Sequence, residues 1–125
     1  MNDSTLYQRL GGRDGIETLV DDIVAAHLRN PVISPRFEPY VEDPERLGEV
    51  KAHLCDFLAQ GSGGPASYEG RSMPAAHRGM NISVEEYMAA VDDIMAALDE
   101  NDIGESAKKD VLAISYRLKD EIVHY

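Results

Sequence analysis

Residues 68–77 read YEGRSMPAAH, and the histidine that ends this stretch, His77, stands among small and apolar side chains. The second half predicts a very short helix, because Pro74 is tolerated in a first helical turn and Gly79 ends the pattern. An imidazole in such surroundings is most often a satisfied core histidine. Small neighbours would equally let a flat apolar cofactor approach the backbone, so both interpretations stay open at this point.

On both sides of this stretch, apolar residues recur at helical spacing. Strand-like alternation is absent, so the sequence predicts an all-α fold. Asp14 with Glu17, and Ser83 with Glu86, have the spacing of capping boxes and predict two helix starts. The substantial helices are expected at residues 15–29, 45–60, 84–100 and 105–123.

Two connections between these helices have a biased composition. Residues 31–44 contain four prolines and predict an irregular connection with Phe37 as its large apolar anchor. Residues 61–70 are rich in glycine and predict a loop. This loop lacks the Gly-Lys-Ser/Thr ending of a P-loop and follows a helix rather than a strand, so a phosphate site is not expected.

Length and charge restrict the class of protein further. The 125 residues suit one domain over residues 1–125, and the formal charge of −11 disfavours nucleic acid and membrane surfaces as partners. A single cysteine, Cys55, excludes an intrachain disulfide and is expected to be an inert buried side chain. Because the N-terminus lacks secretory features and no stretch is long enough to span a bilayer, we expect a cytoplasmic protein.

The histidines are the most informative polar residues. His27 lies at the edge of an apolar helix face and is expected to make one structural hydrogen bond. His53 follows Val50 at helical spacing, near the apolar face of the second long helix. Together, His53 and His77 could face each other across a slot for a heme, in which a neutral imidazole nitrogen binds iron.

Adjacent acidic residues are expected to play no part in such a site. Neighbouring positions point to different faces of a helix, so these carboxylates are expected to be solvated rather than to work as an acid/base pair. The pairs are Asp21-Asp22, Glu85-Glu86 and Asp92-Asp93.

Several stretches of the chain, in order, resemble truncated hemoglobins of the first group. They are LYQRLGG at residues 6–12, VDDIVAAHLRNP at residues 20–31, KAHLCDFL at residues 51–58 and the stretch that ends at His77. The resemblance covers residues 6–123 and includes paired glycines at 11–12 and 63–64. It implies a two-over-two sandwich of helices, with the helices at 15–29 and 45–60 over those at 84–100 and 105–123.

This resemblance also implies a function. His77 takes the place of the proximal ligand to heme iron, and the expected ligand is a diatomic gas such as oxygen, nitric oxide or carbon monoxide. The chain has no Cys-x-x-Cys-His motif, so we expect heme b rather than c-type attachment. The porphyrin is expected to contact Phe37, Met73 and Tyr87, while Lys51 and Arg71 are candidates to pair with its propionates.

The chain departs from the family on the ligand side of the heme. The resemblance places Val24 where a tyrosine is usual, and Val50 and Leu54 where glutamines are usual. These apolar residues would line the ligand pocket. A bound oxygen carries partial negative charge, and losing one buried donor to it typically costs about 1–3 kcal/mol. The sequence therefore predicts weak hydrogen bonding to the bound gas.

His53 is the polar residue left on the matching stretch of the second long helix. Two roles remain open for it: a sixth ligand to iron, or an outward position beside a heme propionate. Two other functions also remain open for the whole chain. One is a heme enzyme that consumes nitric oxide or peroxide with the help of a reductase, and the other is a cofactor-free helical interaction module.

Overall fold

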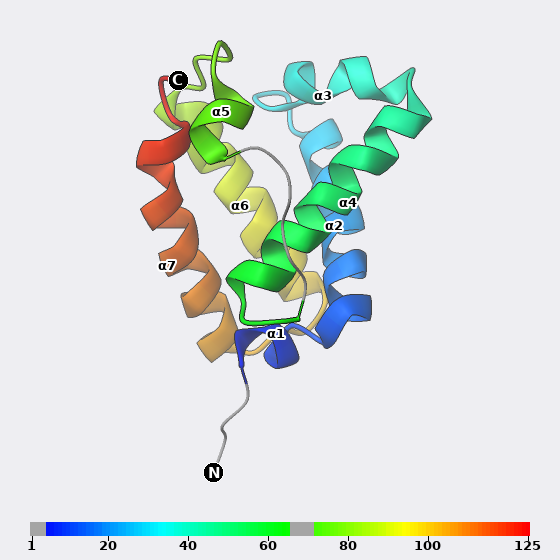
Figure 1. Cartoon of the computed structure of the whole chain (residues 1–125), viewed down its shortest axis with the longest axis vertical. Coiled ribbons are helices and arrows are strands. Elements are labelled where there is room, and N and C mark those ends of the chain that lie inside the picture. Colours follow the sequence, from blue (N-terminus) through cyan, green and yellow to red (C-terminus); the bar gives the residue numbers. More distant parts are fainter. Residues whose placement is uncertain (1–4, 66–71) are drawn as a thin grey trace.

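The computed structural model describes residues 5–65 and 72–125, which form seven helices (Figure 1). Within these residues, extended structure is limited to an isolated parallel bridge between Ile82 and Val123, so the predicted all-α class is confirmed. The described helices include none long and apolar enough to cross a membrane. The helices are α1 (Leu6–Arg9), α2 (Gly12–Arg29), α3 (Ser34–Val41), α4 (Pro44–Gly61), α5 (Met73–His77), α6 (Val84–Glu100) and α7 (Glu105–Ile122).

The long helices form two layers, with α2 at the centre. Helix α2 packs against both α4 and α6, and α6 packs in turn against α7 (Figure 1). The short helix α5 lies against α7, while α3 bridges α2 and α4. This arrangement is the two-over-two sandwich expected from the sequence.

Apolar faces hold these layers together in two clusters. The larger one is built around the face of α2 that carries Ile16, Val20 and Val24, which are almost completely buried. Residues from α1, α4, α6 and α7 complete this cluster. The smaller cluster joins α6 to the end of α7 and consists of Tyr87, Val91 and Ile122, with Met73 of α5 packed against it.

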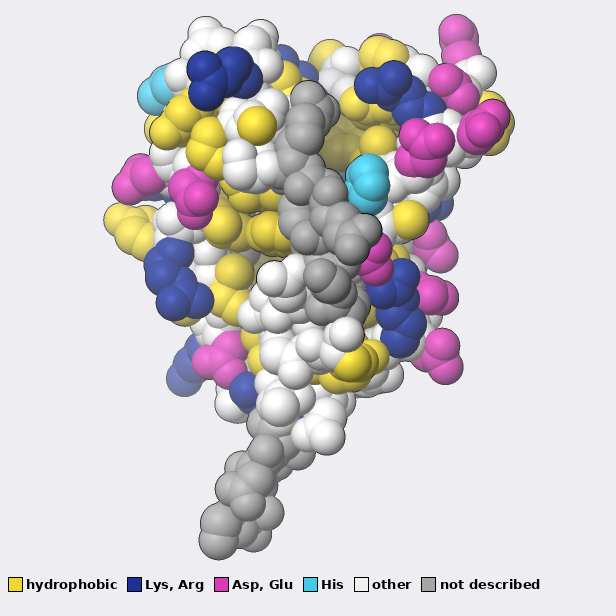
Figure 2. All heavy atoms as spheres, viewed as in Figure 1, with side chains coloured by type: hydrophobic (Ala, Val, Ile, Leu, Met, Phe, Trp, Pro, Cys, Tyr) yellow, Lys and Arg dark blue, Asp and Glu magenta, His cyan; other side chains and the backbone are white. Residues whose placement is uncertain are grey.

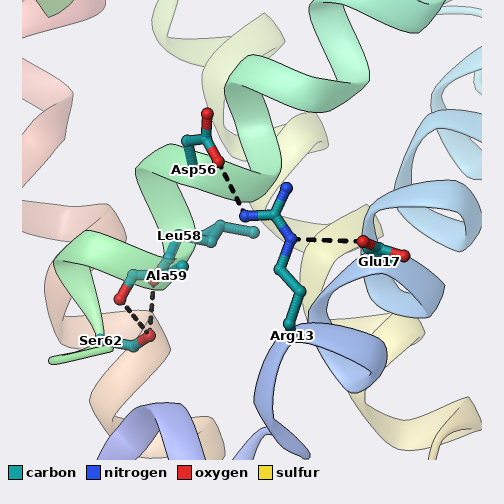
Figure 3. A network of polar contacts seen from close by, with 6 residues as sticks. All are labelled: Arg13, Glu17, Asp56, Leu58, Ala59 and Ser62. Atoms are coloured by element: carbon teal, nitrogen blue, oxygen red, sulfur yellow. Dashed lines mark hydrogen bonds and ion pairs between the residues drawn. The ribbon is translucent and has the colours of Figure 1, made fainter. Parts of the chain in front are cut away.

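Polar contacts fix the α2–α4 interface. Arg13 donates to Glu17 of its own helix at 3.3 Å and to Asp56 of α4 at 2.7 Å (Figure 3). One turn earlier on α4, the Lys51 ammonium lies 3.2 Å from a carboxylate oxygen of Asp21. Both ion pairs join the same two helices, so α4 is attached to the molecule through its α2-facing side.

Two local expectations from the sequence are wrong. Asp14 does not start α2, because the helix already begins at Gly12, after Gly11 at a φ of 96°. Residues 34–41 form helix α3 rather than an irregular connection. Pro35 falls in the first turn, where no intrahelical N–H bond is lost. The other predicted start is correct, since Ser83 and Glu86 do form a capping box.

Candidate functional site

Helix α5 holds the His77 ring in one orientation. The Ser72 side chain caps the helix by accepting from Ala75 N at 3.3 Å. One turn later, His77 Nδ1 lies 2.8 Å from the carbonyl oxygen of Met73. A carbonyl can only accept, so Nδ1 carries the proton and the Nε2 of the neutral ring keeps its lone pair. A ring fixed in this way is prepared for metal ligation through Nε2.

Helix α4 presents an apolar face that the protein leaves partly uncovered. This face carries Val50, Leu54 and Phe57, which are all half-buried. Helix α4 packs on α2 and α3, and in the described part of the chain it has no extensive contact with α5, α6 or α7. Figure 2 shows the molecule hollowed between α4 and α5, with hydrophobic side chains inside the hollow. The two helices therefore flank an apolar slot.

The His77 side of the slot is also apolar. The side chains of Met73, Ala75 and Ala76 are half-buried, and Met73 packs against the cluster that contains Tyr87. The Tyr87 hydroxyl donates to the carbonyl oxygen of Ser115 at 2.5 Å. Burial raises the pKa of Tyr87 above its usual value of 10.0, and the charge of Glu121 raises it further. Tyr87 is therefore a neutral packing residue with a fixed ring, rather than an acid or base.

The structure does not gather the other candidate residues in this slot. Val24 is 1% exposed, deep in the larger cluster. His53 is exposed on α4, next to the half-buried Leu54. Lys51 pairs with α2, and its predicted role towards a propionate stays a prediction. Arg71 lies outside the described residues.

Phe37 rests on the buried ring of His27, whose partner Asp93 the sequence did not reveal. Its ring centroid lies 5.2 Å from that of His27, which is 6% exposed. His27 Nδ1 lies 2.7 Å from a carboxylate oxygen of Asp93 on α6, so the expected structural hydrogen bond of His27 is present. The expectation of a solvated Asp93 is wrong. In the structure Asp92 is exposed and Asp93 is half-buried. The sequence alone does not distinguish these two adjacent acids.

A second polar contact joins α3 to α6. Arg36 donates to both carboxylate oxygens of Glu86, at 2.7 and 3.0 Å. The hydrogen bonds from Arg36 and then from the Ser83 backbone lower the pKa of Glu86 from 4.5 to about 2. This pair ties the helix that carries Phe37 to the start of α6, so Glu86 is not the solvated acid expected from the sequence.

Two open grooves lie elsewhere on the described surface, and neither is lined by a histidine. The first, of about 330 Å³ between α2 and α6, is lined by three acids, Asp22, Asp93 and Glu100, against the single cation of Arg29. These acids would repel the propionates of a heme. The second runs along the outer face of α7, beside the exposed Leu112 and Tyr116. The slot between α4 and α5 is thus the better fit for a porphyrin.

An all-α sandwich with a histidine beside an apolar slot is the arrangement expected of a globin-like protein, and comparisons with known proteins show that class. A family model described as bacterial-like globin matches residues 5–124. A group 1 truncated hemoglobin of Nostoc commune is 33% identical over 86 residues, which is 69% of each chain. One from Synechocystis is 28% identical over 116 residues, which is 90% of each chain.

Solved structures show the same fold. The Fe(III) form of truncated hemoglobin from Tetrahymena pyriformis superposes with a TM-score of 0.88 at 21% identity. That match covers 98% of this chain and 100% of the other. A group II truncated hemoglobin from Bacillus anthracis gives a TM-score of 0.84 at 25% identity, covering 99% and 94% of the two chains.

The chain belongs to the bacterial-like globin family. Its resemblance to group 1 truncated hemoglobins is confirmed, and membership of the family makes it a heme-binding globin. The residues present fit that cofactor, because His77 offers Nε2 beside a slot flanked by apolar side chains.

Proposed function

We propose that the chain binds one heme b through His77 Nε2 and reversibly ligates a small gas such as oxygen, nitric oxide or carbon monoxide. The heme iron supplies the coordination position for the gas. The observation that carries the proposal is the hydrogen bond from His77 Nδ1 to Met73, which leaves Nε2 as the ring's lone-pair donor. In histidine-ligated hemes the same tautomer is required.

The residues that the resemblance places on the ligand side of the heme keep the proposed gas pocket apolar. Val24, Val50 and Leu54 offer neither a hydrogen-bond donor nor a charge. A gas-binding role is therefore favoured over efficient consumption of nitric oxide or peroxide, which requires polar groups that stabilise charge on the reacting ligand. Reduction of the iron still needs an electron donor, so a reductase is the protein partner that we propose.

Replacement of His77 tests the proximal assignment. In His77→Gly, heme should lose its protein ligand and bind weakly, and added imidazole should restore the absorbance spectrum of the wild type. His124→Gly is the matched control, because His124 is exposed near the C-terminus and its φ of 66° suits glycine. Unchanged heme affinity and spectra in His77→Gly would refute the assignment.

We further propose that His53 binds the sixth position of the iron in part of the resting population. His53 follows Val50 by three positions and precedes Leu54 by one, on the helix that lies across the slot from α5. Low-spin bands in the resting protein should disappear in His53→Leu, and added carbon monoxide should then bind faster. A resting spectrum that is identical in both proteins would leave His53 beside a propionate or at the surface.

The remaining properties follow from the whole chain. We propose one domain over residues 1–125 in the cytoplasm, without nucleic acid or membrane partners, since a formal charge of −11 repels both phosphate backbones and anionic lipid. A cofactor-free module is the alternative, and heme titration tests it. Such a module would develop no Soret band.

A further inference from the structure

A carboxylate of α6 holds two separate groups of α2. Asp93 Oδ2 lies 2.7 Å from His27 Nδ1, and the Asn30 side-chain amide donates to both oxygens of Asp93, at 3.2 and 3.3 Å. The side chains of His27 and Asp93 are 8% and 15% exposed. Hydrogen bonds to a carboxylate in such a sheltered place are stronger than those between neutral groups, so both partners are held firmly.

Asn30 in turn builds the corner from which α3 starts. Its side-chain oxygen accepts from Val32 N at 3.1 Å. Its backbone carbonyl accepts from Ile33 N at 3.0 Å and from Ser34 N at 2.7 Å. Ser34 is the first residue of α3. The Asn30 side chain, which is hydrogen-bonded to Asp93, therefore fixes the direction in which α3 leaves α2.

His27 supports the same helix at a second point. Its ring meets the ring of Phe37 at a centroid distance of 5.2 Å and an interplanar angle of 44°. Phe37 is half-buried, and its ring also contacts Tyr40 at 6.1 Å. Asp93 is thus hydrogen-bonded both to Asn30, from which α3 starts, and to His27, on which the Phe37 ring of α3 packs.

We propose that Asp93 is a positioning residue that holds Phe37, acting through His27 and Asn30, at the place where the resemblance to truncated hemoglobins puts this ring against the porphyrin. The consequence for a bound gas rests on the proposed function, while the effect on Phe37 does not. Loss of the carboxylate releases the His27 ring and the Asn30 side chain together. Phe37 then samples more than one position, and the gas bound beneath it experiences more than one environment.

Fluorine NMR can follow Phe37 directly, because the chain contains two phenylalanines, Phe37 and Phe57. Protein labelled with fluorophenylalanine gives two signals, and Phe37→Leu assigns them. In Asp93→Ala, the Phe37 signal should shift and broaden with and without heme, while the Phe57 signal on α4 stays in place. The C–O stretching band of the carbon monoxide complex should split into more than one component.

Matched variants separate positioning from general loss of structure. Asp92→Ala removes the exposed neighbouring charge and should leave both fluorine signals and the C–O band unchanged. Asp93→Asn keeps an acceptor for His27 and should restore a narrow Phe37 signal at least in part. If Asp93→Ala does not fold, His27→Gln decides instead, and a Phe37 signal that is unchanged in that variant overturns the inference. His27→Gln keeps a donor to Asp93 without the ring, and it should shift the Phe37 signal as well.

The outcomes for Phe37 and for heme are independent. A Phe37 signal that is unchanged in folded Asp93→Ala, or that moves as much in Asp92→Ala, overturns the inference. If the wild type develops no Soret band, the proposed function fails, yet the fluorine signals of the protein without heme still decide whether Asp93 positions Phe37. Movement of Phe37 together with a single unchanged C–O band overturns the pocket role.

Discussion

From the ion pair between Arg36 and Glu86 we predict how much one substitution lowers the free energy of unfolding. In Glu86→Gln, the carboxylate charge is removed while the capping box is kept, because glutamine serves equally well at its third position. The chain itself provides the example, since the capping box of α1 pairs Thr5 with Gln8. The substitution therefore removes the attraction of the carboxylate to Arg36, together with the smaller effect of its charge at the start of α6.

The size of the effect follows from the pKa of Glu86, which falls from 4.5 to about 2 in the folded protein. Because one unit of pKa corresponds to about 1.4 kcal/mol, the full difference gives an upper bound of roughly 3 kcal/mol. The side chains of Arg36 and Glu86 are 30% and 20% exposed, so solvent screening reduces this value. We expect Glu86→Gln to lose about 1–2 kcal/mol near neutral pH, or ~4–8 °C in Tm.

The same pKa sets the pH dependence of this loss. Since the pKa of Glu86 is lower in the folded chain than in the unfolded chain, its contribution is complete above pH 4.5 and disappears as the pH falls towards 2. Urea denaturation, followed by circular dichroism at about pH 7 and about pH 3, should show the difference between wild type and variant shrinking at the acidic pH.

Glu85→Gln provides the control, because Glu85 is an exposed acid in the same helical turn. It keeps the ion pair with Arg36 and should cost little at either pH. A Glu86→Gln variant as stable as the wild type near neutral pH would refute the reasoning. So would a loss of the same size at both pH values, which would point to packing rather than charge.

Four further predictions concern other parts of the molecule. Gly48→Ala should stabilise α4 by about 0.5–1 kcal/mol, because nothing lies near the added methyl group. Gly15→Ala should cost about 1–3 kcal/mol in the same denaturation assay, because its methyl group would meet the Leu10 carbonyl. Burial raises the pKa of the Cys55 thiol, so a thiol reagent should modify it slowly in the native protein and rapidly in denaturant. Leu54→Gln adds a donor to the proposed ligand side and should lower the C–O stretching frequency and slow oxygen dissociation roughly tenfold.

The long helices could be predicted from the sequence because each has a continuous apolar face at helical spacing. Helix α3 could not, since four prolines in residues 31–44 argue against regular structure. Contacts with residues of other helices stabilise α3, above all those of Arg36 with Glu86 and of Phe37 with His27. Such contacts between residues far apart in the sequence override local preference, and no local pattern announces them.

The site divides in the same way. His77 could be proposed from the sequence because the stretch that ends there resembles the family, and because Pro74 favours the short helix that carries it. Asp93 was not accessible, because its partner His27 lies 66 positions away. Asp92 and Asp93 cannot be distinguished in the sequence. Only the fold shows that Asp93 is hydrogen-bonded to α2 while Asp92 faces solvent.

The distribution of polar groups around the slot suggests how this globin treats its ligand. The donors of His27 and Asn30 lie beside Phe37, where both bind Asp93, while Val24 and Leu54 are the residues that we propose for the ligand side. A pocket of this kind discriminates between gases by shape and access more than by hydrogen bonding. Because carbon monoxide depends less on a donor than oxygen does, we expect the ratio of carbon monoxide to oxygen affinity to exceed that of Leu54→Gln, where the donor is restored.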